Sequence, residues 1–184
     1  MDKSFERKYS LEIPKLRLGE NEDAFSVDRS FFAEFEHSFI EEGDVEIEVL
    51  TVKYNTHLDM AMHFKGVVTL HCDRCLEPYP HEIDFNQKVI YSYSEELEFD
   101  TDEVILIKEH EPILVLVKEF FDFINLQVPI RRVPSPEVHV CDDNVLRMLG
   151  LLPPEEGEEE AIDEEEEIDP RWAALKNLSQ KDNT

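Results

Sequence analysis

Two cysteines in the middle of the chain have the spacing of a tetrahedral metal site. Cys72 and Cys75 are separated by two residues and stand between two segments with strand-like alternation. A C-x-x-C turn lets two thiolates converge on one zinc ion, as in zinc ribbons. A structural zinc ion needs four ligands, and the nearest further pair is His139 and Cys141, about sixty residues later. These four residues are the candidate zinc ligands.

Other interpretations of the cysteines remain open. His71 and His81 stand beside the first pair and are alternative ligands to His139. The thiols can also be reduced side chains that serve packing, inherited from a metal-binding relative. A thioredoxin-like redox role fits less well, because that motif opens a helix beside a βαβ unit. The chain has three cysteines, an odd number that does not suit a secreted disulfide framework and indicates a reducing compartment.

The chain is strongly acidic, with a formal net charge of −26. Residues 155–169 contain eleven acids and no Lys or Arg, and removing those eleven charges from −26 still leaves −15. Nucleic-acid binding draws much of its affinity from cationic side chains that release counterions from phosphates. The composition therefore favours a basic protein partner over naked RNA or DNA.

Three arginines are candidates for a local contact with RNA. Arg131 and Arg132 form a basic pair, and Arg74 lies inside the C-x-x-C turn. The basic pair either touches a phosphate or offsets neighbouring acids. Arg74 either points outward for recognition or pairs with Asp73 or Glu77, and local pairing is the preferred interpretation.

Catalytic and membrane roles find little support in the residues. The chain has only five glycines, too few for a glycine-rich phosphate loop, and it contains no H-E-x-x-H, G-x-S-x-G or Asp-rich metal loop. No apolar run approaches the roughly 20 residues of a membrane-spanning helix. The charged N-terminus lacks the apolar centre of a secretory signal. We expect a cytoplasmic binding protein with no catalytic residues, no small-molecule substrate and no membrane contact.

The elements that must position these residues are predicted first as strands. Alternating apolar residues indicate strands over residues 45–51, 58–72, 83–93 and 104–107, preceded by a bent or edge strand over 9–18. Gly66 breaks the second of these runs. Because the connections are short, antiparallel meander pairing is favoured over βαβ crossovers.

Helical spacing of apolar residues predicts the remaining elements. Helices are expected over residues 28–39, 112–127 and, more weakly, 142–149. The expected fold is α+β: a curved or barrel-like antiparallel sheet, one long helix packed on it and a short C-terminal helical tail. The expected divisions are a domain over 1–152, an acidic flexible linker over 153–168 and a helical peptide over 169–184.

The C-terminal tail has the features of a binding peptide. Trp172, Leu175 and Leu178 form an i, i+3, i+6 stripe, with Arg171 and Lys176 alongside. Trp and Arg are typical anchors of interfaces, and an amphipathic helix on a flexible linker is typical of a segment that docks in a partner's groove. The alternative is a tail that folds back onto its own domain and covers an apolar groove there.

Three segments together resemble one known family. They are G-x-V-x-L-x-C-D-R-C-L-E-P at residues 66–78, the helix ending in P-I-R-R at 112–132, and D-P-R-W-A-A-L-K-N-L at 169–178. In this order they are similar to the YceD-like family of large ribosomal RNA subunit accumulation proteins. Many members of that family carry a second close cysteine pair, where this chain has only His139 and Cys141.

The resemblance implies a role in the maturation or stability of the large ribosomal subunit and its RNA. Combined with the charge, it predicts an accessory factor that docks onto a basic large-subunit protein or assembly factor and meets rRNA only locally or indirectly. The alternative function is a zinc-dependent structural or regulatory module unrelated to ribosomes. An RNA-processing enzyme is the third interpretation.

Overall fold

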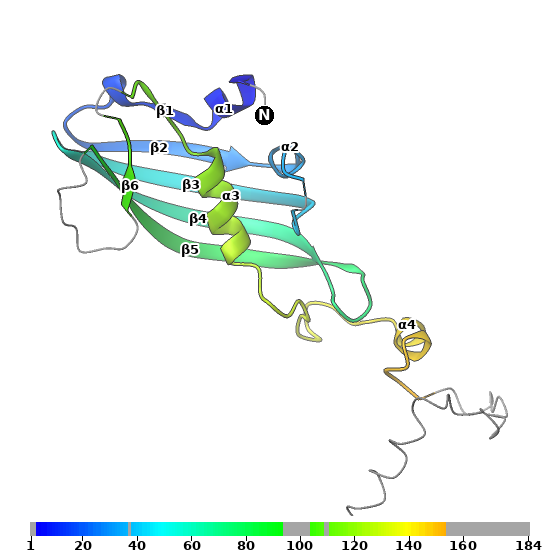
Figure 1. Cartoon of the computed structure of the whole chain (residues 1–184). Helices are drawn as coiled ribbons and strands as arrows, with labels where there is room; N and C mark the ends of the chain where they lie inside the picture. Colours follow the sequence, from blue (N-terminus) through cyan, green and yellow to red (C-terminus); the bar gives the residue numbers. More distant parts are fainter. Residues whose placement is uncertain (1–2, 37, 94–103, 109–110, 154–184) are drawn as a thin grey trace, which may run out of the picture. The chain divides into compact units, whose positions relative to one another are not determined.

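Five hydrogen-bonded strands form the central sheet of the protein. The structure is a computed structural model that describes residues 3–36, 38–93, 104–108 and 111–153. In the sheet, the strand order is β2-β3-β4-β5-β6. The strands are β2 (Gly19–Val27), β3 (Glu42–Lys53), β4 (His57–His71), β5 (Pro78–Ser92) and β6 (Val104–Leu106) (Figure 1).

The first four strands pair as an antiparallel meander, and for β3, β4 and β5 this pairing was predicted from their short connections. The short strand β6 departs from this pattern, because it pairs parallel to β5 with Ile90 opposite Val104. The barrel-like form of the prediction is wrong: in the described residues the sheet ends at β2 and at β6, and these two edges do not pair.

Alternation along the strands gives the sheet one buried and one exposed side. In β3 the side chains of Val45, Ile47 and Val49 are buried, whereas those of Glu46 and Glu48 are exposed. We call the side with the buried residues the inner face and the other side the open face. Successive strand residues point to opposite sides, so the same pattern continues into β2, β4 and β5.

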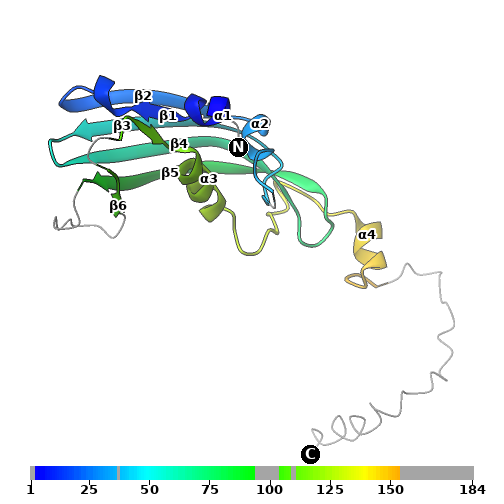
Figure 2. The same ribbon diagram turned by 45° about the horizontal axis from the view of Figure 1, so that its top comes forward.

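A layer of short elements covers the inner face. It consists of α1 (Lys3–Lys8), β1 (Ser10–Glu12), the 3₁₀ turn η1 (Ile13–Lys15), α2 (Arg29–Phe32), β7 (Ile113–Val115) and α3 (Val117–Leu126). In two views α3 lies over the sheet (Figures 1 and 2). Phe120 of α3 is fully buried, and its ring centroid lies 5.2 Å from that of Phe25 and 6.0 Å from that of Phe64. The helix is thereby held against β2 and β4.

The helix predicted over residues 112–127 is shorter than expected. Residues 113–115 form β7, which pairs antiparallel with β1 and places Leu114 opposite Leu11. The helix therefore begins at Val117. Apolar spacing did not distinguish the two states, because a short apolar run fits a strand and a helix alike. Leu126, expected on the apolar face, is 76% exposed.

The N-terminal third contains further departures. The predicted bent strand over residues 9–18 is β1 followed by η1, where Pro14 occupies the first turn. Strand β2 was not predicted, because its inward positions carry polar Asn21 and Asp23 before Phe25. The helix expected over residues 28–39 is reduced to the four residues of α2, which begins after Asp28 accepts a hydrogen bond from the Ser30 N–H.

The chain divides into two compact units, Met1–Asp142 and Asp143–Thr184, and each is described by itself. The second unit contains the predicted weak helix as α4 (Asp143–Met148). The expected linker beyond Pro153 and the tail peptide over 169–184 lie outside the described residues, so these divisions stay predictions. Within the described ranges, no helix has the length and apolar character needed to span a membrane.

Candidate metal centre

The C-x-x-C motif forms the tight turn that joins β4 to β5. We call residues 72–77 the cysteine turn. The Cys72 N–H donates to the Glu77 carbonyl over 2.9 Å, and the Leu76 N–H donates to the Cys72 carbonyl over 2.9 Å. Leu76 has a φ of 61°, a left-handed conformation that L-residues with a Cβ adopt at a cost. The turn therefore brings both thiols to one side at the expense of a strained backbone.

A distant segment is attached to the cysteine turn by one arginine. The Asp73 N–H donates to the Arg132 carbonyl over 2.9 Å, and the Arg132 N–H returns a bond to the Asp73 carboxylate over 2.7 Å. The Arg132 guanidinium also lies 2.8 Å from that carboxylate. These bonds hold residues 132–141, which follow α3, against the turn.

The attachment brings all four candidate ligands together. The sulfur atoms of Cys72, Cys75 and Cys141 and a ring nitrogen of His139 all lie within 4.8 Å of one another. The Cys72 and Cys141 sulfurs are 3.8 Å apart, and the Cys75 sulfur lies 3.0 Å from His139 Nε2. We call these residues the Cys₃His cluster. The predicted partners of the C-x-x-C pair are confirmed as its neighbours in space.

The donor set and the burial of the Cys₃His cluster are compatible with zinc. With zinc–sulfur bonds of about 2.3 Å, the edge of a regular tetrahedron is about 3.8 Å, the separation of the Cys72 and Cys141 sulfurs. All three cysteines are buried, and the His139 side chain is only 11% exposed. Four protein ligands occupy every position of a tetrahedral ion, which is the arrangement of structural rather than catalytic zinc.

The surroundings of Cys72 lower the pKa of its thiol and so favour the thiolate, the form that binds metal. Burial is the largest influence on Cys72 and raises its pKa, but hydrogen bonds from the backbone N–H groups of Arg74 and Cys75 and from neighbouring thiols outweigh it and lower the pKa to about 7. Burial, together with the neighbouring thiols, raises the pKa of Cys141 to about 11. Metal binding must therefore displace a proton from Cys141, which makes the affinity depend on pH.

The surroundings of the cluster contain contacts that the sequence did not predict. Glu77 places a carboxylate oxygen 3.6 Å from His139 Nε2 and 3.9 Å from the Cys75 sulfur. The ring of Tyr79 stacks on that of His139 at 6.3 Å between centroids. The pairing of Asp73 with Arg132 joins residues 59 positions apart, which no local pattern in one sequence indicates. His71 and His81, the alternative ligands, do not belong to the cluster found among the described residues.

The structure places the three arginines differently from one another. Arg132 is committed to Asp73 and also lies 5.0 Å from the centre of the Phe39 ring. Arg131 is exposed. The Arg74 Nε atom is buried and has no hydrogen-bond partner within the described part of the chain. The expected ion pair between Arg74 and Asp73 is not formed, because the Asp73 carboxylate pairs with Arg132. The tail residues Arg171, Trp172, Leu175, Lys176 and Leu178 lie outside the described residues.

Comparison with known proteins gives one match. Residues 60–179 match the family model described as large ribosomal RNA subunit accumulation protein YceD. The matched range contains the whole Cys₃His cluster and extends through Leu178 of the tail. No curated protein and no solved structure matches the chain.

Proposed function

Because the chain belongs to the YceD family of large ribosomal RNA subunit accumulation proteins, we propose that it is an accessory factor in large-subunit biogenesis that acts by binding. The observation that carries the proposal is the family match, which covers well over half of the chain. The family description refers to accumulation of large-subunit ribosomal RNA and gives no mechanism. Mechanism has to be argued from the residues.

Binding, and not catalysis, is supported by the character of the candidate centre. A zinc ion held by Cys72, Cys75, His139 and Cys141 would have no open position for water or substrate. When bound, such an ion supplies a cross-link between the cysteine turn and the segment that follows α3. The residues themselves already connect these segments through Asp73 and Arg132. In this proposal the metal centre therefore has a structural role.

The partner that fits best is a basic protein of the large subunit or of its assembly. The net charge of −26 opposes association with a phosphate backbone and favours a cationic polypeptide surface. The commitment of Arg132 to Asp73 further weakens the case for RNA contact there. Arg131 and Arg74 remain candidates for a local contact with rRNA.

The tail is the proposed peptide that reaches the partner. Trp172, Leu175 and Leu178 supply the apolar stripe, and Arg171 and Lys176 flank it. Deletion of residues 169–184 separates this role from that of an internal clasp. The docking role predicts an unchanged melting temperature and lost partner binding, whereas the clasp predicts a large fall in melting temperature.

Two measurements test the proposed function. Depletion of the protein should lower the amount of large-subunit rRNA relative to small-subunit rRNA. Affinity purification of the full chain should recover large-subunit proteins both before and after nuclease treatment. Recovery that disappears with nuclease would show attachment through RNA and contradict the basic-protein partner. An unchanged rRNA ratio, together with stoichiometric zinc, would favour the module unrelated to ribosomes.

A further inference from the structure

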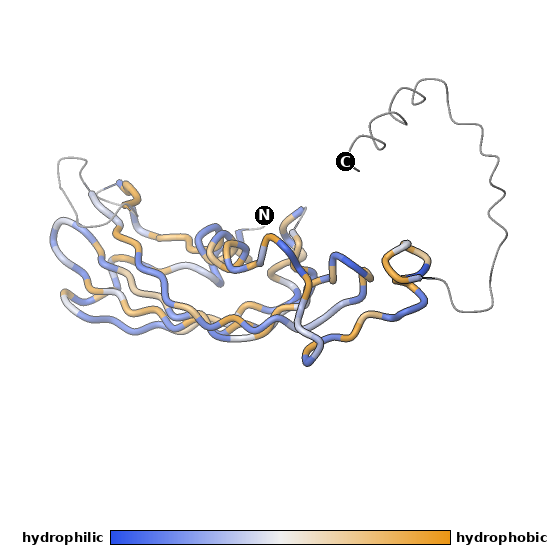
Figure 3. Tube along the Cα trace, turned by 90° about the horizontal axis from the view of Figure 1, so that it is seen from below, coloured by the Kyte–Doolittle hydropathy of each residue, from blue (hydrophilic) through white to orange (hydrophobic). Residues whose placement is uncertain are grey.

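Among the described residues of the first unit, no helix or strand covers the open face of the sheet. Helices α1, α2 and α3 and the β1–β7 pair lie on the inner side. In Figure 3 the helical turns of this unit lie to one side of the strands. On the open face the side chains of Leu50 and Val67 are 38% and 42% exposed.

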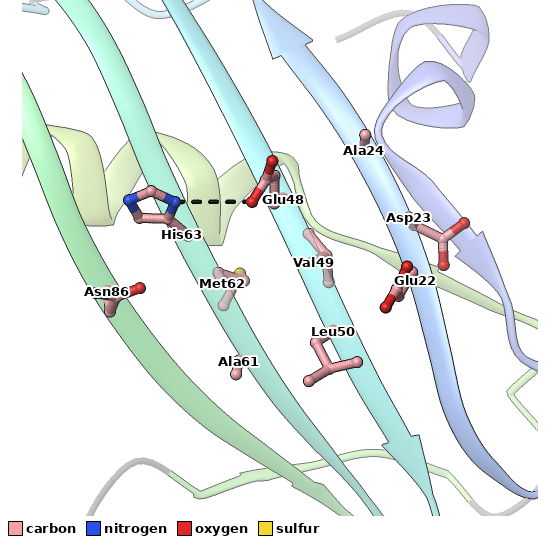
Figure 4. Close-up of a pocket in the computed structure, with 10 residues that line it drawn as sticks. All are labelled: Glu22, Asp23, Ala24, Glu48, Val49, Leu50, Ala61, Met62, His63 and Asn86. Atoms are coloured by element: carbon pink, nitrogen blue, oxygen red, sulfur yellow. Dashed lines mark ion pairs between the residues drawn. The ribbon is translucent and has the colours of Figure 1, made fainter.

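Two alanines leave a depression at the centre of the open face. Ala24 on β2 and Ala61 on β4 flank Leu50 and Glu48 of β3, and a groove of about 550 Å³ lies above them (Figure 4). A second groove of about 400 Å³ continues from the shared residues Leu50 and Ala61 toward Ile90 on β5. The two grooves share their middle, so a hollow with an apolar floor crosses the strands from β2 to β5.

Carboxylates dominate the border of this hollow. Nine acids and two lysines point to the open face: Glu20, Glu22, Glu42, Asp44, Glu46, Glu48, Asp59, Glu82 and Asp84, with Lys65 and Lys88. A surface with this excess of negative charge attracts cationic side chains and repels phosphates. It also repels a second copy of itself.

His63 stands in the middle of the open face between two of these acids. Its Nε2 lies 2.9 Å from the Asp84 carboxylate. Its Nδ1 lies 3.8 Å from the Glu48 carboxylate (Figure 4). The hydrogen bond from His63 lowers the pKa of Asp84 and keeps that carboxylate ionised.

We propose that the open face binds an extended cationic polypeptide segment, with small apolar side chains in the hollow between Ala24 and Ala61 and lysines or arginines on the surrounding acids. The charge excludes nucleic acid, and the apolar floor gives the segment a defined path. The inference rests on the proposed function, because it names the surface that receives the basic partner. The tail peptide is then a second contact with that partner.

A short synthetic peptide tests the surface directly. Four strands at about 4.8 Å spacing are crossed by about six extended residues, so a labelled peptide of about ten alternating lysines and alanines is long enough. We measure its affinity for the full chain by fluorescence anisotropy. Glu22→Lys with Glu48→Lys should weaken binding on the order of tenfold, and raised salt should do the same. Glu34→Lys with Glu41→Lys changes the net charge equally at exposed sites off the sheet and should have a much smaller effect.

A steric variant separates a defined site from general charge attraction. Ala61→Gln fills the hollow without changing the charge and should weaken the peptide on the order of tenfold, whereas Ala33→Gln at an exposed position should not. Equal effects of the two charge-reversal pairs, or no effect of Ala61→Gln, would overturn the proposal. So would a dimer that dissociates on Ala61→Gln, or peptide affinity that rises when residues 169–184 are deleted, since the face would then hold another copy or the tail.

The same variants keep this proposal distinct from the proposed function. If the wild-type chain recovers large-subunit proteins and Ala61→Gln recovers them equally, the function stands and the assignment of the open face fails. If the wild-type chain binds the peptide but depletion leaves the large-subunit rRNA unchanged, the face stands as a binding site and the ribosomal function fails.

Discussion

The sulfur atoms of Cys72 and Cys141 lie 3.8 Å apart, although 69 residues separate them along the chain. This separation is far longer than the roughly 2.05 Å of a disulfide bond. It equals the edge of a tetrahedron of thiolates around zinc. Closing so long a loop costs conformational entropy, so the contact has to be stabilised by the Asp73–Arg132 bonds, by burial or by a shared metal ion.

Zinc binding is the first prediction. Protein purified without an affinity tag and with zinc in the growth medium should contain one zinc ion per chain by mass spectrometry of metals. Zinc at about a thousandfold above its dissociation constant stabilises by about 4 kcal/mol, so a chelator should lower the melting temperature by roughly 10 °C.

Single substitutions check which residues hold the ion. Cys72→Ser and Cys141→Ser should both lose the zinc, and their melting temperatures should no longer respond to the chelator. His81→Ala is the matched control, because His81 lies near the cysteine turn in sequence but outside the Cys₃His cluster. Zinc retained by Cys141→Ser would exclude this residue as a ligand, and a wild-type protein without zinc would leave the thiols as packing residues.

The packing of α3 on the sheet gives the second prediction. Phe120 is fully buried against Phe25 and Phe64, so Phe120→Ala should cost about 3–5 kcal/mol in the free energy of unfolding. Phe121 is half-buried and stacks on Phe35 at 3.7 Å between centroids, so Phe121→Ala should cost about half as much. Leu126→Ala, at an exposed site, should change stability by less than about 0.5 kcal/mol. Urea unfolding measures all three, and equal values for Phe120 and Leu126 would contradict the packing.

Backbone strain in the cysteine turn gives the third prediction. Leu76 has a φ of 61° and is 72% exposed, so its side chain contributes little packing. Leu76→Gly should remove about 1 kcal/mol of left-handed strain and raise the stability. Gly19 is the reciprocal control, because its φ is 91° with open space around it, and Gly19→Ala should lower the stability by about 1 kcal/mol. If Leu76→Gly instead lowers the stability, contacts of the leucine side chain must stabilise the turn by more than the strain costs.

Much of the sheet was predictable, because alternation is a local property of the strands. The predicted runs became β3, β4 and β5, with the predicted meander order. Gly66 was taken as a break, yet β4 runs through it and pairs it with Val45 of β3. A Cβ at residue 66 would overlap the Asp44 carbonyl oxygen and lie 2.6 Å from the Val45 Cα. The glycine permits the close approach of two strands, a tertiary reason that periodicity does not contain.

The candidate centre was predictable in its residues but not in its construction. Cys72 and Cys75 follow from spacing alone, and the short list of other cysteines and histidines leads to Cys141 and His139. The contact of Asp73 with Arg132, and the choice of β7 over a longer helix, depend on pairing between distant segments. The open face was also invisible in the sequence, because alternation predicts an exposed side without saying whether another layer covers it.

A buried carboxylate in α3 gives the last prediction, a dependence of stability on pH. Burial raises the pKa of Glu119, and one of its carboxylate oxygens is buried without a hydrogen-bond partner in the described residues. Lys118, Asp122 and Tyr91 face it, and only the lysine is positive. Burial raises the pKa of Tyr91 as well, and the charge of Glu119 adds to that effect. The fold therefore favours the protonated form of Glu119.

The sign of the effect follows from proton binding in the two states. Below the unfolded pKa of about 4.3 both states hold the proton and Glu119 costs nothing. As the pH rises through the raised folded pKa, the folded protein must ionise a buried group, and its stability falls. Glu119→Gln should remove this loss and stabilise the protein by about 1 kcal/mol at pH 7 while changing little at pH 4. Glu20→Gln, at an exposed site on β2 away from Glu119, should show no such difference between the two pH values. Urea unfolding at both pH values measures the gain, and a Glu119→Gln protein that is less stable than the wild type at pH 7 would show that the carboxylate is stabilised where it lies.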